Sequence, residues 1–278
     1  MNDIKMVATD LDGTFFDNQR KINQEKFDKL LTYFEAHDMH FVIATGNDQP
    51  LVDMIFEPFI GRFDYNVNNG AQVKTKTGKS LRSSAFPRTD LPEIQALIEQ
   101  DDTMHFRHGI IFNGIQDSYM LAHYKGIGDL YQDIRWYFPN LKFIDQISDI
   151  PANEEIVKVI FSAAESEAKN FIKHTNEAFS EKYHATTSGY GAIDVIPANT
   201  NKATGLAYLL DYYDLNADQV MAFGDGFNDL EMLNFVGEPR SMPNGDAYLI
   251  NHFKNAIASN DQDGVLDTII TELALPLT

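Results

Sequence analysis

The strongest constraint on how this sequence can fold is an alternation of short, nearly continuous apolar runs with segments of helical periodicity. The run IKMVATD near the N-terminus shows no regular exchange of polar and apolar residues. A strand of this composition is buried on both faces, as in parallel sheets that carry helices on either side. The alternation therefore predicts an α/β fold with a mostly parallel sheet.

Helical periodicity is clearest directly after the first apolar run. Asn23 suits the N-cap position, because its side chain can accept a hydrogen bond from the first turn. The apolar residues that follow recur at i, i+3, i+4 and i+7, which predicts a helix with one apolar face. These residues are Phe27, Leu30, Leu31 and Phe34.

Two stretches of the chain share this strand-and-helix pattern, and the stretch between them differs. Near the C-terminus, AIDVIP and QVMAFGDG are predicted strands, and KATGLAYLLDYY and NDLEMLNFV are predicted helices. Between them and the N-terminal part the patterns are shorter and mixed. We predict a Rossmann-like parallel-sheet core formed by residues 1–83 and 191–278, with an α+β cap domain, residues 84–190, inserted into it.

Composition and charge exclude several classes of function. The formal net charge of −19 disfavours non-specific binding to nucleic acid or to an anionic membrane. The absence of cysteine excludes disulfides, thiolate nucleophiles and zinc held by cysteine. No apolar run approaches the roughly 20 residues that span a bilayer, and the N-terminus lacks the layout of a signal peptide. We expect a cytoplasmic protein without nucleic-acid or membrane partners, whose oligomeric state stays open.

Four polar clusters share one placement, where a predicted strand ends or a helix begins. In open α/β sheets, ligands bind outside the carboxyl ends of the strands, so clusters far apart in the sequence can meet there. Two neighbouring carboxylates repel each other, which indicates that a positive charge belongs beside them. The clusters are DLDGT at residues 10–14, TG at Thr45 and Gly46, NTNK ending at Lys202, and GDGFND at residues 224–229.

These residue types suit phosphoryl transfer assisted by a metal. Mg²⁺ prefers oxygen ligands, which Asp10 and Asp225 can supply. An aspartate can attack phosphorus and form an aspartyl phosphate, and a second carboxylate two residues on, Asp12, can protonate the leaving group. The Thr45 hydroxyl, the backbone N–H groups of the turns and Lys202 can hold the phosphoryl oxygens.

Taken together and in this order, the motifs resemble those of the haloacid dehalogenase-like hydrolase superfamily. The position of the insert and the segments NNGA, MPNG and NDQDGV resemble its Cof-type phosphatase subfamily. The resemblance implies a Mg²⁺-dependent phosphatase that hydrolyses a small phosphorylated metabolite, such as a sugar phosphate, through an aspartyl-phosphate intermediate. It also implies that the cap sets substrate specificity.

The resemblance implies a role for each matching residue. Asp10 is the implied nucleophile and Asp12 the implied general acid/base. The implied metal site consists of the Asp10 carboxylate, the Asp12 backbone carbonyl and Asp225, with Asp229 orienting the metal's surroundings. The implied phosphate-binding residues are Thr45, Gly46, Lys202 and Asn228. The sequence departs from the family pattern at Asn47, where arginine is frequent, and at Ala203, where glycine is common.

Three other interpretations stay open. Asp10 and Asp12 taken alone can simply stabilise a turn, although four clusters in this order favour a functional site. A phosphosugar mutase would use the same nucleophile and return the phosphoryl group to the sugar. A catalytically silent protein that binds a phosphometabolite is the third, and the intact set of Asp10, Asp12, Lys202 and Asp225 argues against it.

Within the insert, the segment HFRHG invites a metal or substrate interpretation. Its histidines, His105 and His108, are three residues apart, so on a strand they would point to opposite faces and would not share a metal. Arg107 and Lys125 are candidates to meet a second anionic group of the substrate.

Overall fold

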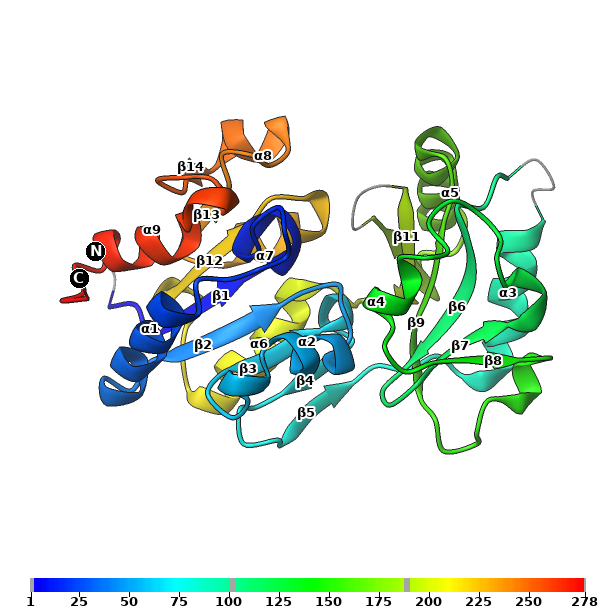
Figure 1. Ribbon diagram of the computed structural model, residues 1–278, viewed down its shortest axis with the longest axis horizontal. Coiled ribbons are helices and arrows are strands. Elements are labelled where there is room, and N and C mark those ends of the chain that lie inside the picture. The colour runs from blue at the N-terminus through cyan, green and yellow to red at the C-terminus, as the bar shows by residue number, and fades with distance from the viewer. Residues whose placement is uncertain (1–2, 101–103, 188–190, 278) are drawn as a thin grey trace. The chain divides into compact units, whose positions relative to one another are not determined.

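The computed structural model describes residues 3–100, 104–187 and 191–277 of the 278-residue chain. The described residues divide into two units, each with its own β-sheet (Figure 1). The first unit comprises Met1–Thr45, Phe56–Arg82 and Asn201–Thr278, and the second comprises Gly46–Ile55 and Ser83–Thr200.

The sheet of the first unit is mostly parallel. Its strands are β1 (Met6–Thr9), β2 (His40–Ala44), β3 (Asp64–Val67), β4 (Gln72–Lys74), β5 (Ser80–Ser83), β12 (Val220–Gly224), β13 (Glu238–Ser241) and β14 (Lys254–Asn255). Their order is β14-β13-β12-β1-β2-β3-β4-β5 (Figure 1). The strands from β14 to β3 run parallel, and β4 is antiparallel to β3. The predicted fold class, an α/β protein with a parallel-sheet core, is therefore confirmed.

The helices of the first unit are α1 (Gln24–Ala36), α6 (Lys202–Tyr213), α7 (Leu230–Phe235), α8 (Ala247–His252) and α9 (Gly264–Glu272). Met6 and Ala8 of β1 share an apolar cluster with Leu206 of α6. On the other face, the ring of Phe41 in β2 packs against Phe27 of α1, with ring centroids 5.0 Å apart. Because successive side chains of a strand alternate between faces, helices on both sides explain why the apolar runs are nearly continuous.

The structure confirms the predicted start and buried face of α1. The Asn23 side chain accepts a hydrogen bond from the backbone N–H of Lys26 at 3.1 Å, which satisfies one of the unpaired N–H groups of the first turn. The four residues predicted to form the apolar face are all at most 1% exposed: Phe27, Leu30, Leu31 and Phe34.

The second unit has a mostly antiparallel sheet in the order β10-β11-β9-β6-β7-β8, in which only the β7–β8 pair among the described strands is parallel. The strands are β6 (His108–Gly114), β7 (Ser118–Leu121), β8 (Leu141–Ile144), β9 (Ile156–Ser162), β10 (Tyr183–Thr186) and β11 (Ala192–Pro197). The helices are α2 (Gln49–Ile55), α3 (Leu91–Glu99), α4 (Ile134–Tyr137) and α5 (Glu165–Ala178). No described helix of either unit has the length and apolar character needed to cross a membrane.

The boundaries of the second unit differ from those predicted for the insert. The predicted cap, residues 84–190, ends before β11, and AIDVIP was expected to be a core strand. In the structure β11 pairs antiparallel with both β9 and β10, so its backbone hydrogen bonds place it in the second sheet. The segment Gly46–Ile55 also groups with the second unit, and the chain returns to the first unit at Asn201.

Phe27 lies at the centre of an aromatic cluster, and truncating it should destabilise the first unit. Its ring contacts Phe15, Phe41 and Phe59 at centroid separations of 5.1, 5.0 and 5.0 Å, and it is 0% exposed. Phe27→Ala is expected to lower the free energy of unfolding by about 3–5 kcal/mol, because it leaves a cavity. Urea unfolding followed by circular dichroism measures this loss.

The matched control is Ile257→Ala, since Ile257 belongs to the same unit and is 54% exposed. Its free energy of unfolding should stay within about 0.5 kcal/mol of the wild type. Equal losses for the two variants would contradict the assignment of Phe27 to the centre of the core.

Candidate active site

The carboxyl ends of β1, β2 and β12 lie side by side at one edge of the first sheet. β1 pairs in parallel with both neighbours over its whole length, so the three strands end together. The residues that follow these strands are Asp10, Thr45 and Asp225. The structure thus brings together three of the clusters that the sequence analysis placed at strand ends.

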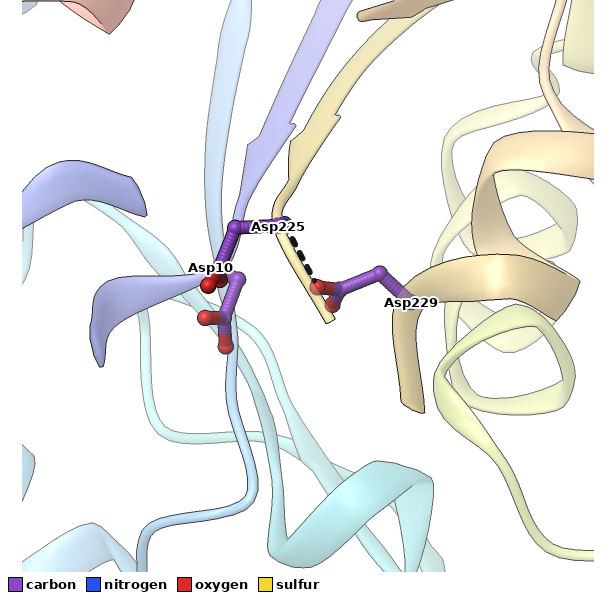
Figure 2. A group of neighbouring side chains, drawn as sticks. All are labelled: Asp10, Asp225 and Asp229. Atoms are coloured by element: carbon purple, nitrogen blue, oxygen red, sulfur yellow. Dashed lines mark hydrogen bonds between the residues drawn. The ribbon is translucent and has the colours of Figure 1, made fainter. Parts of the chain in front are cut away.

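Three carboxyl groups converge at this edge. Asp10, Asp225 and Asp229 each offer an oxygen, and these oxygens all lie within 4.8 Å of one another. Figure 2 shows Asp10 and Asp225 on neighbouring strand ends, with Asp229 reaching toward them from the turn before α7. The Asp229 Oδ2 atom accepts hydrogen bonds from the backbone N–H groups of Asp225 and Gly226, both at 3.0 Å. Asp229 is therefore fixed by the same turn that carries Asp225.

Lys202 joins the fourth cluster to these carboxylates. It is the first residue of α6, and its side chain is 0% exposed. Its Nζ atom donates to Asp10 Oδ1 at 2.6 Å and to Asp229 Oδ1 at 2.5 Å. Burial opposes the charge on Lys202, but attraction to Asp10 and Asp229 outweighs it and raises the pKa of the ammonium group. Lys202 is thus positively charged at neutral pH.

Asp10 and Asp225 have raised pKa values. Burial is the largest cause for Asp10 and raises its pKa well above the ordinary value; Lys202 opposes this, and the neighbouring carboxylates reinforce it. Burial, followed by repulsion from Asp229, raises the pKa of Asp225 to about 7. Both shifts show that this cluster resists becoming fully ionised.

The cluster suits a divalent metal ion. Three carboxylates against one ammonium group leave a formal surplus of two negative charges when all are ionised. A divalent cation would balance that surplus, and an all-oxygen set of donors matches the preference of Mg²⁺. Asp10, Asp225 and Asp229 therefore fit a Mg²⁺ ion by both charge and donor type.

The loop after β1 holds a contact that the sequence analysis missed. Asp12 is half-buried in the turn Leu11–Phe15, and Gly13 has a positive φ of 78°. A Cβ atom at Gly13 would lie 2.5 Å from Asp225 Oδ2, so only glycine fits there. The Thr14 hydroxyl donates to Asp225 Oδ1 at 2.9 Å. Its place within DLDGT was the only sequence signal for Thr14.

Thr45 and Asn228 lie at the same edge of the first sheet. The Thr45 backbone N–H donates to the carbonyl of Asn66, and its own carbonyl accepts from the N–H of Asn69, both at 3.0 Å. The Asn228 Nδ2 atom donates to Asn69 Oδ1 at 3.4 Å. Asn66 in β3 and Asn69 just after it therefore hold Thr45 through their backbone groups, and the Asn69 side chain contacts Asn228. Sequence reasoning did not assign this organising role to Asn66 and Asn69.

The remaining predicted site residue, Gly46, groups with the second unit. Its carbonyl accepts a 2.6 Å hydrogen bond from Nζ of Lys158, a buried lysine on β9. Lys158 Nζ also lies 3.7 Å from Asp194 Oδ1. Lys158 thus fixes the Gly46 carbonyl, a contact between residues 112 positions apart that the TG cluster by itself does not indicate.

Arg107 and Lys125, the charged residues singled out in the insert, contact side chains of the same unit. Lys125 Nζ lies 5.4 Å from the centroid of the Phe143 ring. Arg107 forms an ion pair with Asp129 at 2.8 Å. His108 is the first residue of β6 and is only 6% exposed, whereas His105 precedes the strand and its side chain is 84% exposed. The two histidines therefore do not share a strand, as the prediction assumed. Contact of Arg107 or Lys125 with a substrate stays a prediction.

Known proteins resemble this chain over nearly its full length. The family described as haloacid dehalogenase-like hydrolase matches residues 7–269. The 5-amino-6-(5-phospho-D-ribitylamino)uracil phosphatase YbjI of Escherichia coli (strain K12) is 26% identical, with 96% of this chain and 95% of that protein covered. A protein of the same function in Bacillus subtilis (strain 168), YitU, is 25% identical, with 94% of each chain covered.

A solved structure shows the same fold. The crystal structure of a protein from Streptococcus mutans UA159 superimposes with a TM-score of 0.89 at 28% sequence identity. The match covers 98% of this chain and 99% of the other.

The raised pKa values predict how pH and Mg²⁺ jointly affect stability. In the folded, metal-free protein the pKa of Asp225 is about 7, against an ordinary value of 3.8. The contribution of Asp225 to the free energy of unfolding is thus fully present below about pH 4, where the carboxyl is protonated in both the folded and the unfolded state. It is lost as the pH rises from about 4 to about 7. Mg²⁺ needs the ionised form, so the increase in Tm on adding MgCl₂ should be larger at pH 7.5 than at pH 5. Thermal unfolding at both pH values measures it.

Two variants test whether Asp225 is responsible. Asp225→Asn should abolish most of the Mg²⁺-induced increase in Tm at pH 7.5. Asp211→Asn, which changes an exposed residue of α6, should leave the increase intact. An increase in Tm that is the same at both pH values in the wild type would contradict the prediction.

Proposed function

Because the chain belongs to the haloacid dehalogenase-like hydrolase family, we propose that it is a Mg²⁺-dependent phosphatase acting in the cytoplasm on a small phosphorylated metabolite. The reaction runs through an aspartyl phosphate on Asp10. The observation that carries the proposal is the arrangement of a buried carboxylate, Asp10, against a buried ammonium group, Lys202, beside two further carboxylates. The packing of a parallel sheet does not require these charges at the carboxyl ends of its strands.

The roles within the site follow from position and chemistry. Lys202 holds one oxygen of Asp10, which leaves the other carboxylate oxygen to attack phosphorus. Lys202, Thr45, Gly46 and Asn228 are the proposed contacts to the phosphoryl oxygens, which carry most of the charge to be stabilised.

The proposed metal ligands are three groups with oxygen donors and one supporting side chain. Mg²⁺ would be held by the carboxylates of Asp10 and Asp225 and by the backbone carbonyl of Asp12, with Asp229 supporting the site. When bound, it supplies positive charge that balances the carboxylates and the transferring phosphoryl group.

Two steps complete the proposed reaction. In the first, an Asp10 oxygen forms a bond to phosphorus, the bond from phosphorus to the leaving oxygen breaks, and Asp12 gives its proton to that oxygen. In the second, Asp12 takes a proton from water as the water oxygen bonds to phosphorus. The bond from phosphorus to Asp10 then breaks, which restores the aspartate and releases inorganic phosphate.

The substrate class is tested by phosphate release. The purified chain is incubated with MgCl₂ and a panel of sugar phosphates, nucleotides and cofactor phosphates. The panel includes 5-amino-6-(5-phospho-D-ribitylamino)uracil, which the names of two relatives indicate as a substrate of those proteins. Inorganic phosphate should appear in stoichiometric amount with the dephosphorylated product. An isomerised phosphate ester without free phosphate would instead indicate a mutase.

Replacing the proposed nucleophile should abolish turnover. Asp10→Asn removes the attacking carboxylate, and kcat should fall by at least about 10⁴-fold. Far-UV circular dichroism should be unchanged, since the amide keeps the shape of the side chain. Asp211→Asn, at an exposed position, is the control with wild-type activity. Phosphate release by Asp10→Asn at more than a tenth of the wild-type rate would contradict the role.

The role of Asp12 is tested by the choice of leaving group. Asp12→Asn cannot protonate an alkoxide, so turnover of an alkyl phosphate should fall by about 10²–10⁴-fold. p-Nitrophenolate leaves without a proton, so p-nitrophenyl phosphate should still phosphorylate Asp10. Rapid mixing should then show a burst of about one equivalent of p-nitrophenolate, followed by slow hydrolysis of the aspartyl phosphate. Equal losses with both esters and no burst would contradict this role.

A further inference from the structure

The loop between β13 and α8, residues 242–246, contacts the turn that carries Asp225. The Met242 N–H donates to the carbonyl of Gly224 at 3.0 Å, and the Asp246 N–H donates to the carbonyl of Asp225 at 2.8 Å. A Cβ atom at Gly245 would lie 2.8 Å from that Asp225 carbonyl, so the two backbones pack without a side chain between them. The loop is thus joined to the β12 end by its own backbone.

Asn244 connects the same loop to the turn Leu11–Phe15 after β1, which directly follows the proposed nucleophile Asp10 and is called the nucleophile loop below. Its Nδ2 atom donates to the carbonyl of Gly13 at 2.7 Å. The peptide unit of that carbonyl continues into Thr14, whose hydroxyl donates to Asp225 Oδ1 at 2.9 Å. A closed ring of contacts results, running from Asp225 through Asp246 and Asn244 to Gly13 and Thr14 and back to Asp225. We call it the Asn244 ring.

Asn260 anchors the amide of Asn244. The Asn260 backbone N–H donates to Asn244 Oδ1 at 3.1 Å, so both polar atoms of the Asn244 side chain are engaged. Asn260 is 7% exposed, and its own Nδ2 atom donates to the carbonyl of Phe16 at 2.9 Å. Asn260, itself bound to the Phe16 carbonyl, therefore holds the Asn244 amide in one orientation.

We infer that Asn244 is a positioning residue that sets the separation between the nucleophile loop and the carboxylate of Asp225, and thereby the affinity of the site for Mg²⁺. The inference rests on the metal site of the proposed function. Among the described residues, the Asn244 side chain forms hydrogen bonds with Gly13 and Asn260 and with neither Asp10 nor the Asp225 carboxylate. Asn244 therefore acts on Asp225 through Gly13 and Thr14.

The size of the effect follows from the exposure of Asn244. The residue is solvent-exposed, so water can replace it at the Gly13 carbonyl and the fold should survive its removal. Loss of residues that orient metal ligands typically weakens metal binding by about 10–100-fold. An exposed contact that acts through one further hydrogen bond belongs at the low end of this range.

The experiment is titration of the full chain with MgCl₂ by isothermal titration calorimetry, without substrate. Asn244→Ala should raise the Kd for Mg²⁺ by about 10-fold, while Tm without metal and the circular dichroism spectrum stay unchanged. The matched control is Asn251→Ala: Asn251 is also an exposed asparagine, and its Nδ2 atom donates within α8 to the carbonyl of Ala247. Its Kd should stay within twofold of the wild type.

A second variant tests the route of the effect. Thr14→Val removes the hydroxyl that reaches Asp225 at nearly constant volume. If Asn244 acts through Thr14, the double variant should bind Mg²⁺ no more weakly than Thr14→Val alone. Independent, multiplying losses would overturn the route through Thr14.

The outcomes separate this inference from the proposed function. A wild-type chain that binds Mg²⁺ but releases no phosphate from any ester refutes the proposed activity. The role of Asn244 is then still decided by the Kd values for Mg²⁺ of the wild type and Asn244→Ala. A Kd for Asn244→Ala within twofold of the wild type overturns the inference while the activity stands. A wild-type chain that does not bind Mg²⁺ overturns both.

Discussion

The rest of the site depends on the ion pairs that the buried ammonium group of Lys202 forms with Asp10 and Asp229. The ammonium group holds carboxylates from two separate elements, the end of β1 and the turn before α7, at 2.6 and 2.5 Å. Breaking a buried ion pair by removing one partner typically costs about 3–5 kcal/mol, because the remaining charge is left without compensation. Lys202 therefore ties α6, β1 and α7 together electrostatically, in addition to the apolar contacts that α6 makes with the sheet.

One ammonium group does not balance three carboxylates, and the proposed function accounts for this imbalance. The raised pKa values of Asp10 and Asp225 are the expected result of burying like charges together. Such an arrangement destabilises the metal-free fold, and perturbed groups of this kind cluster at functional sites. The aromatic core around Phe27 and the apolar clusters on the sheet offset the free energy lost by burying these carboxylates. The first unit therefore stays folded with several charges at the carboxyl ends of its strands.

The sequence analysis predicted single helices and strands correctly where the signal was local, and it misassigned segments whose sheet or unit depends on distant partners. Asn23 and the apolar face of α1 were predicted correctly, because capping and helical periodicity depend only on near neighbours. The segment AIDVIP was correctly predicted as a strand but assigned to the wrong sheet. A strand of six residues does not encode its partners, and its pairing with β9 and β10 is decided by backbone hydrogen bonds to distant segments. The grouping of Gly46–Ile55 with the second unit escaped prediction for the same reason.

The sequence by itself determined the residue types of the site and their placement at strand ends, because the parallel fold and its carboxyl edge follow from local composition. Only the tertiary structure decided which side chains meet there. Thr14 and Asp225 are 211 positions apart, and Asn244 and Gly13 are 231 apart, so no periodicity links the members of either pair. Their contacts exist because the register of parallel strands aligns the ends of β1 and β12, and the loop after β13 then closes against both.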